Sequence, residues 1–311
     1  YNRTDYDNII SMNVSLASGY GSIRGNGREY ERRGTEITLN ARPVQGDFSW
    51  DLALNWSKNH RYLTELEENK DRDGFIHLGT RIDQQYLIRW LRNPQGQIIY
   101  NASTGLPIRD TYRRFVGYGD PDFQFGFQSQ FSYKNFALHV SVEGQWGGMY
   151  SSILPRMKRA GTSADLDMKL REEAANGLKT YVGDGVVVTG GEVTYDFDGN
   201  ITNDTRTYAP NTTSVSYEDW VKTYYNLGGG EEEGWLDASY LKLRDISLSY
   251  TLPASLLKKT SFSSATLSLI GNNVWLLTKR TSKGDDPSWL TGTSLKSPTP
   301  VSYGLNINLK F

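Results

Sequence analysis

Histidines are the first residues in this sequence that could support catalysis. His60, His77 and His139 lie far apart, and none belongs to an HExxH pattern. The sequence contains no GxSxG elbow and no Walker loop, and no serine is accompanied by a recognisable base and orienting acid. We therefore expect no enzyme activity and no catalytic residue. His139 falls on the polar face of an expected strand, so we interpret it as lining a wet interior.

Two acidic segments could bind a cation. Asp196, Asp198 and Asn200 place oxygen side chains at alternate positions, as a calcium loop does, but the glutamate expected at the twelfth position is missing. The same residues form a hairpin-turn sequence, which is the favoured interpretation. The run 231–233 consists of three glutamates after three glycines, and such a run is usually solvated rather than metal-bound. We expect no metal and no cofactor.

Aromatic residues near the second acidic segment could bind a ligand. A short helix is expected over 217–225, and it carries Trp220, Tyr224 and Tyr225; Trp235 follows closely. Flat aromatic faces can stack on sugar rings or on a peptide, so these four residues are the candidate substrate-binding residues. The alternative is that they pack within the loop or against a partner protein. A further helix is expected over 163–177, with Ser163 as its cap.

Period-two alternation of apolar and polar residues is the strongest signal in the sequence, and it predicts β-strands. The clearest runs are 48–57, 123–133, 136–146 and 301–311, with shorter ones at 12–16, 37–41, 246–252 and 265–269. The sequence therefore predicts about eight strands.

Short and long connections alternate between these strands. Residues 42–47 and 134–135 are tight turns, whereas 60–121, 150–239 and 277–300 are long. Outer-membrane β-barrels show this asymmetry, with brief periplasmic turns and extended extracellular loops. Aromatic residues also gather near the predicted strand ends, as in the aromatic girdles of such barrels. The predicted fold is all-β: a transmembrane antiparallel barrel with short helices in its long loops.

Composition excludes several other classes of protein. The 311 residues include 34 Lys and Arg against 35 Asp and Glu, so there is no basic excess for binding nucleic acid. Cysteine is absent, which excludes disulfides and thiolate sites. Mean hydropathy is −0.56, and no apolar run reaches the ~18 residues of a membrane helix. The first residues lack the features of a signal peptide, so we expect that a leader was removed or that the chain begins partway through a longer one.

Several segments, in order, resemble the SusC/RagA type of TonB-dependent outer-membrane transporter. The run 237–253 (DASYLKLRDISLSYTLP) resembles the C-terminal signature of that family, 271–275 (GNNVW) its GxNLW strand and 303–311 its closing strand. Residues 33–37, 119–123, 133–136 and 286–287 resemble its NKGIE, GDPxPDF, YKNF and DPE segments. Arg33 and Ser288 depart from the family pattern; these differences would affect local contacts and leave the alternation of apolar and polar residues unchanged.

The resemblance implies a larger assembly in the bacterial outer membrane. Family members are plugged barrels of about 22 strands, so residues 1–311 would be the C-terminal segment, with plug and early strands upstream. The implied function is TonB-dependent import of glycan or peptide oligomers, with TonB, a SusD-like surface lipoprotein and outer-membrane lipid as partners. The last strand resembles the signal read by the outer-membrane assembly machinery. Its signal residues would be Tyr303, Leu305, Ile307, Leu309 and Phe311.

Two other interpretations remain at this point. A stand-alone small outer-membrane barrel would have a structural or adhesive role. A soluble carbohydrate-binding sandwich would bury Phe125, Val140, Leu248 and Ile307 between two stacked sheets.

Overall fold

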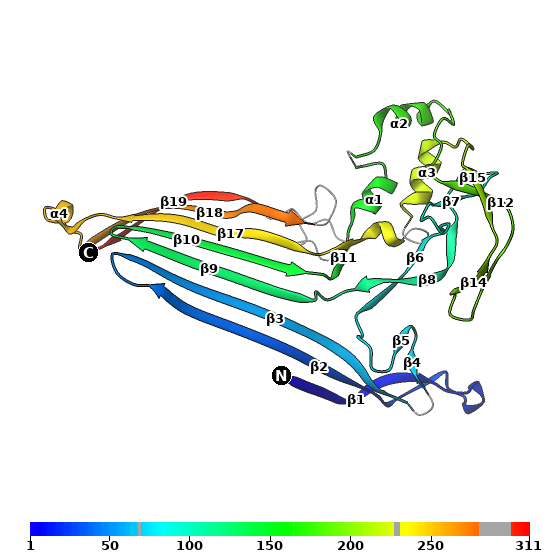
Figure 1. The fold of residues 1–311 in the computed structure, drawn as a ribbon, viewed down its shortest axis with the longest axis horizontal. Coiled ribbons are helices and arrows are strands. Elements are labelled where there is room, and N and C mark those ends of the chain that lie inside the picture. Colours follow the sequence, from blue (N-terminus) through cyan, green and yellow to red (C-terminus); the bar gives the residue numbers. More distant parts are fainter. Residues whose placement is uncertain (68–69, 164, 227–230, 280–299) are drawn as a thin grey trace.

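Eight long strands form one antiparallel sheet, which is the main body of the molecule (Figure 1). The computed structural model describes residues 1–311 except 68–69, 164, 227–230 and 280–299. The sheet order is β1-β2-β3-β9-β10-β17-β18-β19, so the prediction of about eight strands is confirmed. The strands are β1 (Asn2–Asn13), β2 (Ser22–Val44), β3 (Phe48–Leu66), β9 (Phe123–Tyr133), β10 (Phe136–Trp146), β17 (Tyr240–Thr251), β18 (Ser264–Lys279) and β19 (Ser302–Lys310).

The sequence misplaced some strand boundaries. The run 12–16 was predicted as a strand, but the strand lies earlier, and Leu16–Ser18 forms a 3₁₀ turn, η1. Gly19 follows this turn with a φ of 80°, which favours glycine. Strands β2 and β3 are also much longer than their alternating runs, because pairing along the hairpin continues through polar sequence.

The register aligns apolar residues into rows across the sheet. One row crosses six strands and consists of Trp50, Phe131, Leu138, Leu248, Leu269 and Leu305, each paired with the next. Since side chains alternate between the faces of a strand, all of these residues share one face.

The opposite face of the sheet carries polar residues that bond across strands. The hydroxyls of Ser249 and Ser268 lie 2.8 Å apart, and the Thr38 hydroxyl donates to Asn55 Oδ1 at 3.0 Å. The sheet is therefore apolar on one face and polar on the other.

Within the described residues, no second sheet covers the apolar face. Leu248 is 45% exposed and Ile307 is 62% exposed, and Phe125 and Val140 are only partly buried. A sandwich would bury all four between two sheets, so that interpretation is wrong.

Ser129 interrupts the apolar face of β9. It lies between Leu52 and Val140 in the register, and it is only 2% exposed. Trp50 covers it: its indole Nε1 donates to Ser129 Oγ at 2.6 Å, and its ring stacks on Phe131 at 5.7 Å. The hydroxyl is thereby satisfied on an otherwise apolar surface.

Replacing Trp50 with Phe should lower the free energy of unfolding by ~1 kcal/mol, because the Ser129 hydroxyl loses its donor. The double variant Trp50→Phe, Ser129→Ala should recover most of this loss, since it removes both partners. Urea unfolding in lipid vesicles measures both. Additive losses in the double variant would contradict the pairing.

The ends of the sheet differ as the sequence predicts. The tight turns at 45–47 and 134–135, together with α4 (Ala254–Leu257), lie at one end, and the long connections 67–122 and 147–239 lie at the other (Figure 1). The third predicted long connection, 277–300, falls mostly outside the described residues.

The long connections contain short helices. Helix α3 (Tyr217–Tyr224) confirms the helix predicted over 217–225. Helix α2 (Met168–Ala175) is shorter than the predicted 163–177, because Asp167 rather than Ser163 caps it, accepting from the Leu170 amide at 2.9 Å. Helix α1 is Leu154–Arg159.

No helix in the described part of the chain is both long enough and apolar enough to cross a membrane.

Candidate functional site

The long connections 67–122 and 147–239 fold together into what we call the loop module (Figure 1). Strand β12 of the second connection pairs with β7 of the first, and β6 pairs with β8 within the first connection. The strands are β4 (Arg72–Asp73), β5 (Ile76–His77), β6 (Gln84–Trp90), β7 (Ile99–Tyr100), β8 (Arg109–Tyr118), β11 (Met149–Ser151), β12 (Val186–Gly190), β13 (Val193–Tyr195), β14 (Ile201–Asp204), β15 (Thr207–Pro210) and β16 (Trp235–Asp237), with the 3₁₀ turn η2 (Glu231–Gly234).

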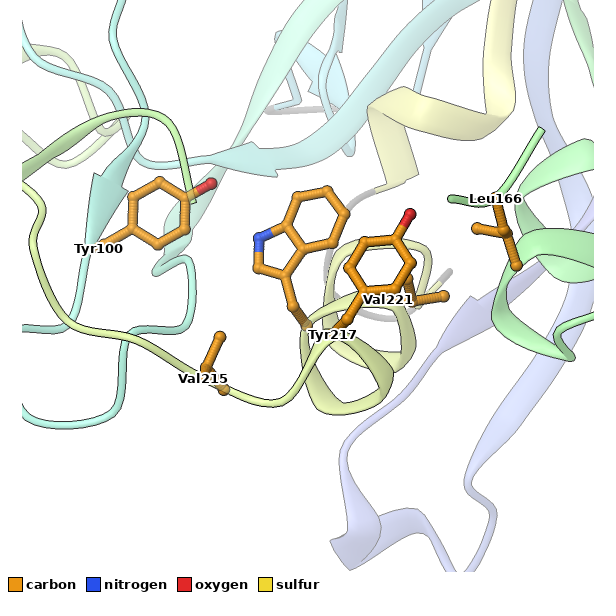
Figure 2. Packing of buried hydrophobic residues seen from close by; sticks show 6 residues of the cluster. Tyr100, Leu166, Val215, Tyr217 and Val221 are labelled. Atoms are coloured by element: carbon orange, nitrogen blue, oxygen red, sulfur yellow. The ribbon is translucent and has the colours of Figure 1, made fainter. Parts of the chain in front are cut away.

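The loop module has its own hydrophobic core. Six buried residues from β7, from α3 and from the segments before α2 and α3 form the cluster, and Figure 2 shows how they converge on α3. Burying this much aromatic and aliphatic surface holds loops that are far apart in the sequence in one fixed arrangement. The residues are Tyr100, Leu166, Val215, Tyr217, Trp220 and Val221.

The candidate substrate-binding aromatics lie in or beside this core. Trp220 is only 8% exposed and stacks on Tyr224 at 4.5 Å, while Tyr224 stacks on Trp90 at 5.5 Å. Tyr225 meets the edge of Tyr224. Trp220 and Tyr224 therefore pack within the loop module, which is the alternative raised from the sequence, because their ring faces are covered by other rings.

Trp235 lies apart from this stack, on β16, where it pairs with Ser151 of β11 and is half-buried. A substrate contact at Trp235 stays a prediction, as does one at the partly exposed Tyr225.

The acidic run 231–233 was expected to be solvated, and this expectation is wrong. Glu232 accepts from Arg89 Nε at 2.7 Å, from Arg92 Nη2 at 3.0 Å and from the Trp90 amide at 3.2 Å. Its neighbour Glu231 accepts from the Ile88 amide at 2.9 Å. The run therefore fastens η2 to the edge of β6, which the sequence could not show because the arginines lie about 140 residues away.

Glu233, the third member of the run, points into the core of the module. The Tyr224 hydroxyl donates to its Oε1 at 2.7 Å, and burial raises the pKa of the Glu233 carboxyl. Burial, together with the adjacent Glu233 carboxylate, also raises the pKa of Tyr224, which stays protonated at neutral pH. This hydrogen bond links α3 to η2.

Replacing Glu232 with Ala should destabilise the loop module by ~2–3 kcal/mol, because two guanidinium groups and one backbone amide lose their acceptor. Glu218→Ala is the matched control: its ion pair with Lys222 is exposed and lies within one helix turn, so only a slight loss of stability is expected. Hydrogen exchange at the β6 amides measures the difference. Equal protection in both variants would contradict the role of Glu232.

The turn interpretation of 196–200 is confirmed. Strands β13 and β14 pair around it, and Asp196 accepts from the Asn200 amide at 2.8 Å and from its side chain at 2.9 Å. Asp198 pairs instead with Arg72, at 2.8 Å. Within the described residues, no group of three acidic or histidine side chains is placed to hold a metal ion.

Arg81 joins the two ends of the connection 67–122. It forms a two-pronged ion pair with Asp83, at 2.9 and 2.6 Å, and donates to the Asp120 carbonyl at 3.0 Å, just before β9 begins. Its guanidinium also lies 3.9 Å from the centre of the Tyr118 ring. His60 of β3 is buried close to Arg81. Sequence reasoning missed this cluster, whose members come from three separate segments, around residues 60, 82 and 119.

The other histidines lie elsewhere. His139 is on the polar face of β10, opposite Gln130 and Ser247, as predicted. His77 is exposed in the short strand β5.

The last strand forms one edge of the sheet. Every residue of β19 is exposed, and among the described strands β19 pairs only with β18. Phe311 packs its ring against Phe262, with centres 5.0 Å apart.

Comparisons with known proteins agree with this architecture. No family model matches the sequence. TonB-dependent receptor P3 of Formosa agariphila is 22% identical, over 94% of this chain and 30% of the receptor. TonB-dependent receptor SusC of Bacteroides thetaiotaomicron is 24% identical over 52% of this chain and 18% of that protein.

Solved structures show the same fold. A chain of the RagAB peptide transporter superposes with a TM-score of 0.63 and 17% identity, over 100% of this chain and 32% of that one. The RagAB peptide importer in its "open-open" state gives a TM-score of 0.61 at 18% identity. The chain thus spans about a third of the proteins that it matches over its whole length. These matches agree with the resemblance carried by the sequence motifs: the chain is similar to part of the SusC-type TonB-dependent receptors.

Proposed function

We propose that this chain is the C-terminal part of the wall and extracellular loops of a TonB-dependent importer in the bacterial outer membrane. The observation that carries the proposal is the two-faced sheet, with rows of apolar residues on one face and bonded polar residues on the other. Such a sheet suits a wall between lipid and a wet lumen. The relatives named above supply the TonB dependence.

The proposed cargo is a glycan or peptide oligomer, and the proposed partners are TonB, a SusD-like lipoprotein over the loops, outer-membrane lipid and the assembly machinery. No covalent step is needed. The exposed edge of β19, with its outward apolar residues, is suited to strand addition during assembly. The loop module would form part of the vestibule above the barrel.

A small barrel made of these strands alone is the second candidate. It requires β1 and β19 to pair and close the sheet, but within the described residues they lie at opposite ends of the strand order. The structure therefore favours the importer.

Uptake by cells tests the importer. Deleting the gene for the whole receptor should abolish accumulation of its fluorescently labelled oligomer, and removing TonB should have the same effect. Glycan and peptide oligomers of matched size are compared in parallel. Accumulation that persists without TonB would contradict the proposal.

A further inference from the structure

A second group of aromatic residues in the loop module surrounds an open pocket of about 760 Å³, which we call the aromatic pocket. The β4–β5 hairpin, the β6–β8 pair and the β13–β14 turn line it. Its aromatic residues are Phe75, Tyr86, Tyr112, Phe115 and Phe197.

The walls of the aromatic pocket are held in place. Arg72 of β4 pairs with Asp198 of the β13–β14 turn, and Arg114 of β8 donates to the Gly199 carbonyl of the same turn. Gly199 has a φ of 81°, and a Cβ there would lie 2.4 Å from the Tyr112 ring. Only glycine allows this close approach, so the turn is seated firmly on β8.

Three of the five rings of the aromatic pocket are exposed, unlike those of the buried core around Trp220. Phe75 stacks on Tyr86 at 4.8 Å, but Phe75 and Phe115 remain 49% and 45% exposed. Phe197 is 88% exposed at the tip of the turn. Several large aromatic side chains left open to solvent around one hollow indicate a binding site, because burying them would otherwise stabilise the fold.

The polar groups of the aromatic pocket are balanced in charge. Each of its three arginines faces a carboxylate: Arg72 that of Asp198, Arg113 that of Glu231, and Arg114 that of Asp110. A charged ligand would have to displace these pairs, since no guanidinium is left over. A hydroxyl group both donates and accepts, so it can bond to a guanidinium and a carboxylate together. Thr111 and Asn200 add further neutral polar groups.

We propose that the aromatic pocket binds a neutral oligosaccharide. The apolar faces of the sugar rings would stack on Phe75 and on Phe197, and their hydroxyls would bond to the arginine–carboxylate pairs. This inference rests on the proposed function, because it requires the loops to face the outside of the cell. It extends that function by naming a site and a class of cargo.

Calorimetric titration of the full-length receptor in detergent tests the proposal. The probes are neutral α- and β-linked hexasaccharides of glucose, mannose, xylose and galactose, an oligogalacturonate, and a mixed-sequence hexapeptide library. Binding of a neutral hexasaccharide is expected, with Phe197→Ala weakening it about tenfold. Phe197→Tyr should keep most of the affinity. Tyr20→Ala, at another exposed aromatic, is the control and should change nothing.

Each contrary result has its own meaning. Binding of the oligogalacturonate or the peptides but of no neutral sugar would overturn the sugar assignment. Equal sugar affinity in Phe197→Ala and the unaltered receptor would overturn the aromatic pocket as the site. No binding to any probe would overturn the inference as well. TonB-dependent uptake that continues in any of these cases would leave the importer itself standing.

Discussion

Replacing Ile246 with Arg is expected to lower the free energy of unfolding by ~2–4 kcal/mol in lipid vesicles, because the charge would face acyl chains. Ile246 lies in the middle of the apolar face, paired with Val140 and Gly271. The neighbouring Ser247 faces the polar side, opposite His139, so Ser247→Arg should cost ~1 kcal/mol or less. Urea unfolding of the vesicle-embedded receptor measures both.

The cost of the substitution should also depend on how deep in the membrane the residue lies. Leu248 and Tyr250 share the face of Ile246 but lie progressively nearer the end of β17. The cost of an arginine should therefore fall in the order Ile246, Leu248, Tyr250, since a long side chain near the interface reaches the head groups. Equal costs on both faces, or no decline toward Tyr250, would show that this face does not meet lipid.

Replacing Arg81 with Met should destabilise the receptor by ~3–5 kcal/mol. Arg81 is 9% exposed, and its removal leaves the buried Asp83 carboxylate without a counter-charge. The stacking over Tyr118 is lost as well. Faster proteolytic cleavage within 67–122 should accompany the lowered unfolding midpoint, because Arg81 joins the two ends of that connection.

Two variants control the Arg81 experiment. Arg3→Met breaks the exposed ion pair with Asp5 and should cost ~0.5 kcal/mol or less. Adding Asp83→Asn to Arg81→Met should recover part of the loss, since it removes the unpaired charge. A similar loss for Arg3→Met and Arg81→Met would contradict the role of Arg81.

The loop module shows how connections of this length can be held in one arrangement. A loop of more than 12–15 residues usually needs its own packing or binding partners to be ordered. Here the Trp90–Tyr224 stack, the Glu232 contacts and the Arg81 contacts each join segments that are distant in the sequence. Aromatic residues are therefore buried by packing in the core around Trp220, whereas Phe197 in the aromatic pocket remains exposed.

The sequence alone determined the strands, their two faces and the resemblance to TonB-dependent receptors. Period-two alternation is a local property of each strand, so Leu305 and Ile307 could be assigned to the apolar face without knowledge of their neighbours. The turn at 196–200 and the helix around Trp220 were likewise readable, because turn and helix preferences also act over a few residues.

Only the tertiary structure decided what the loops do. The sequence could not show that Glu232 meets Arg89, that Trp90 stacks on Tyr224, or that Phe197 stays open beside Arg72. Each of these contacts depends on the meeting of segments whose separation leaves no periodic trace in the sequence. The free energy of such long-range contacts is set by burial and geometry, which residue type and spacing do not specify.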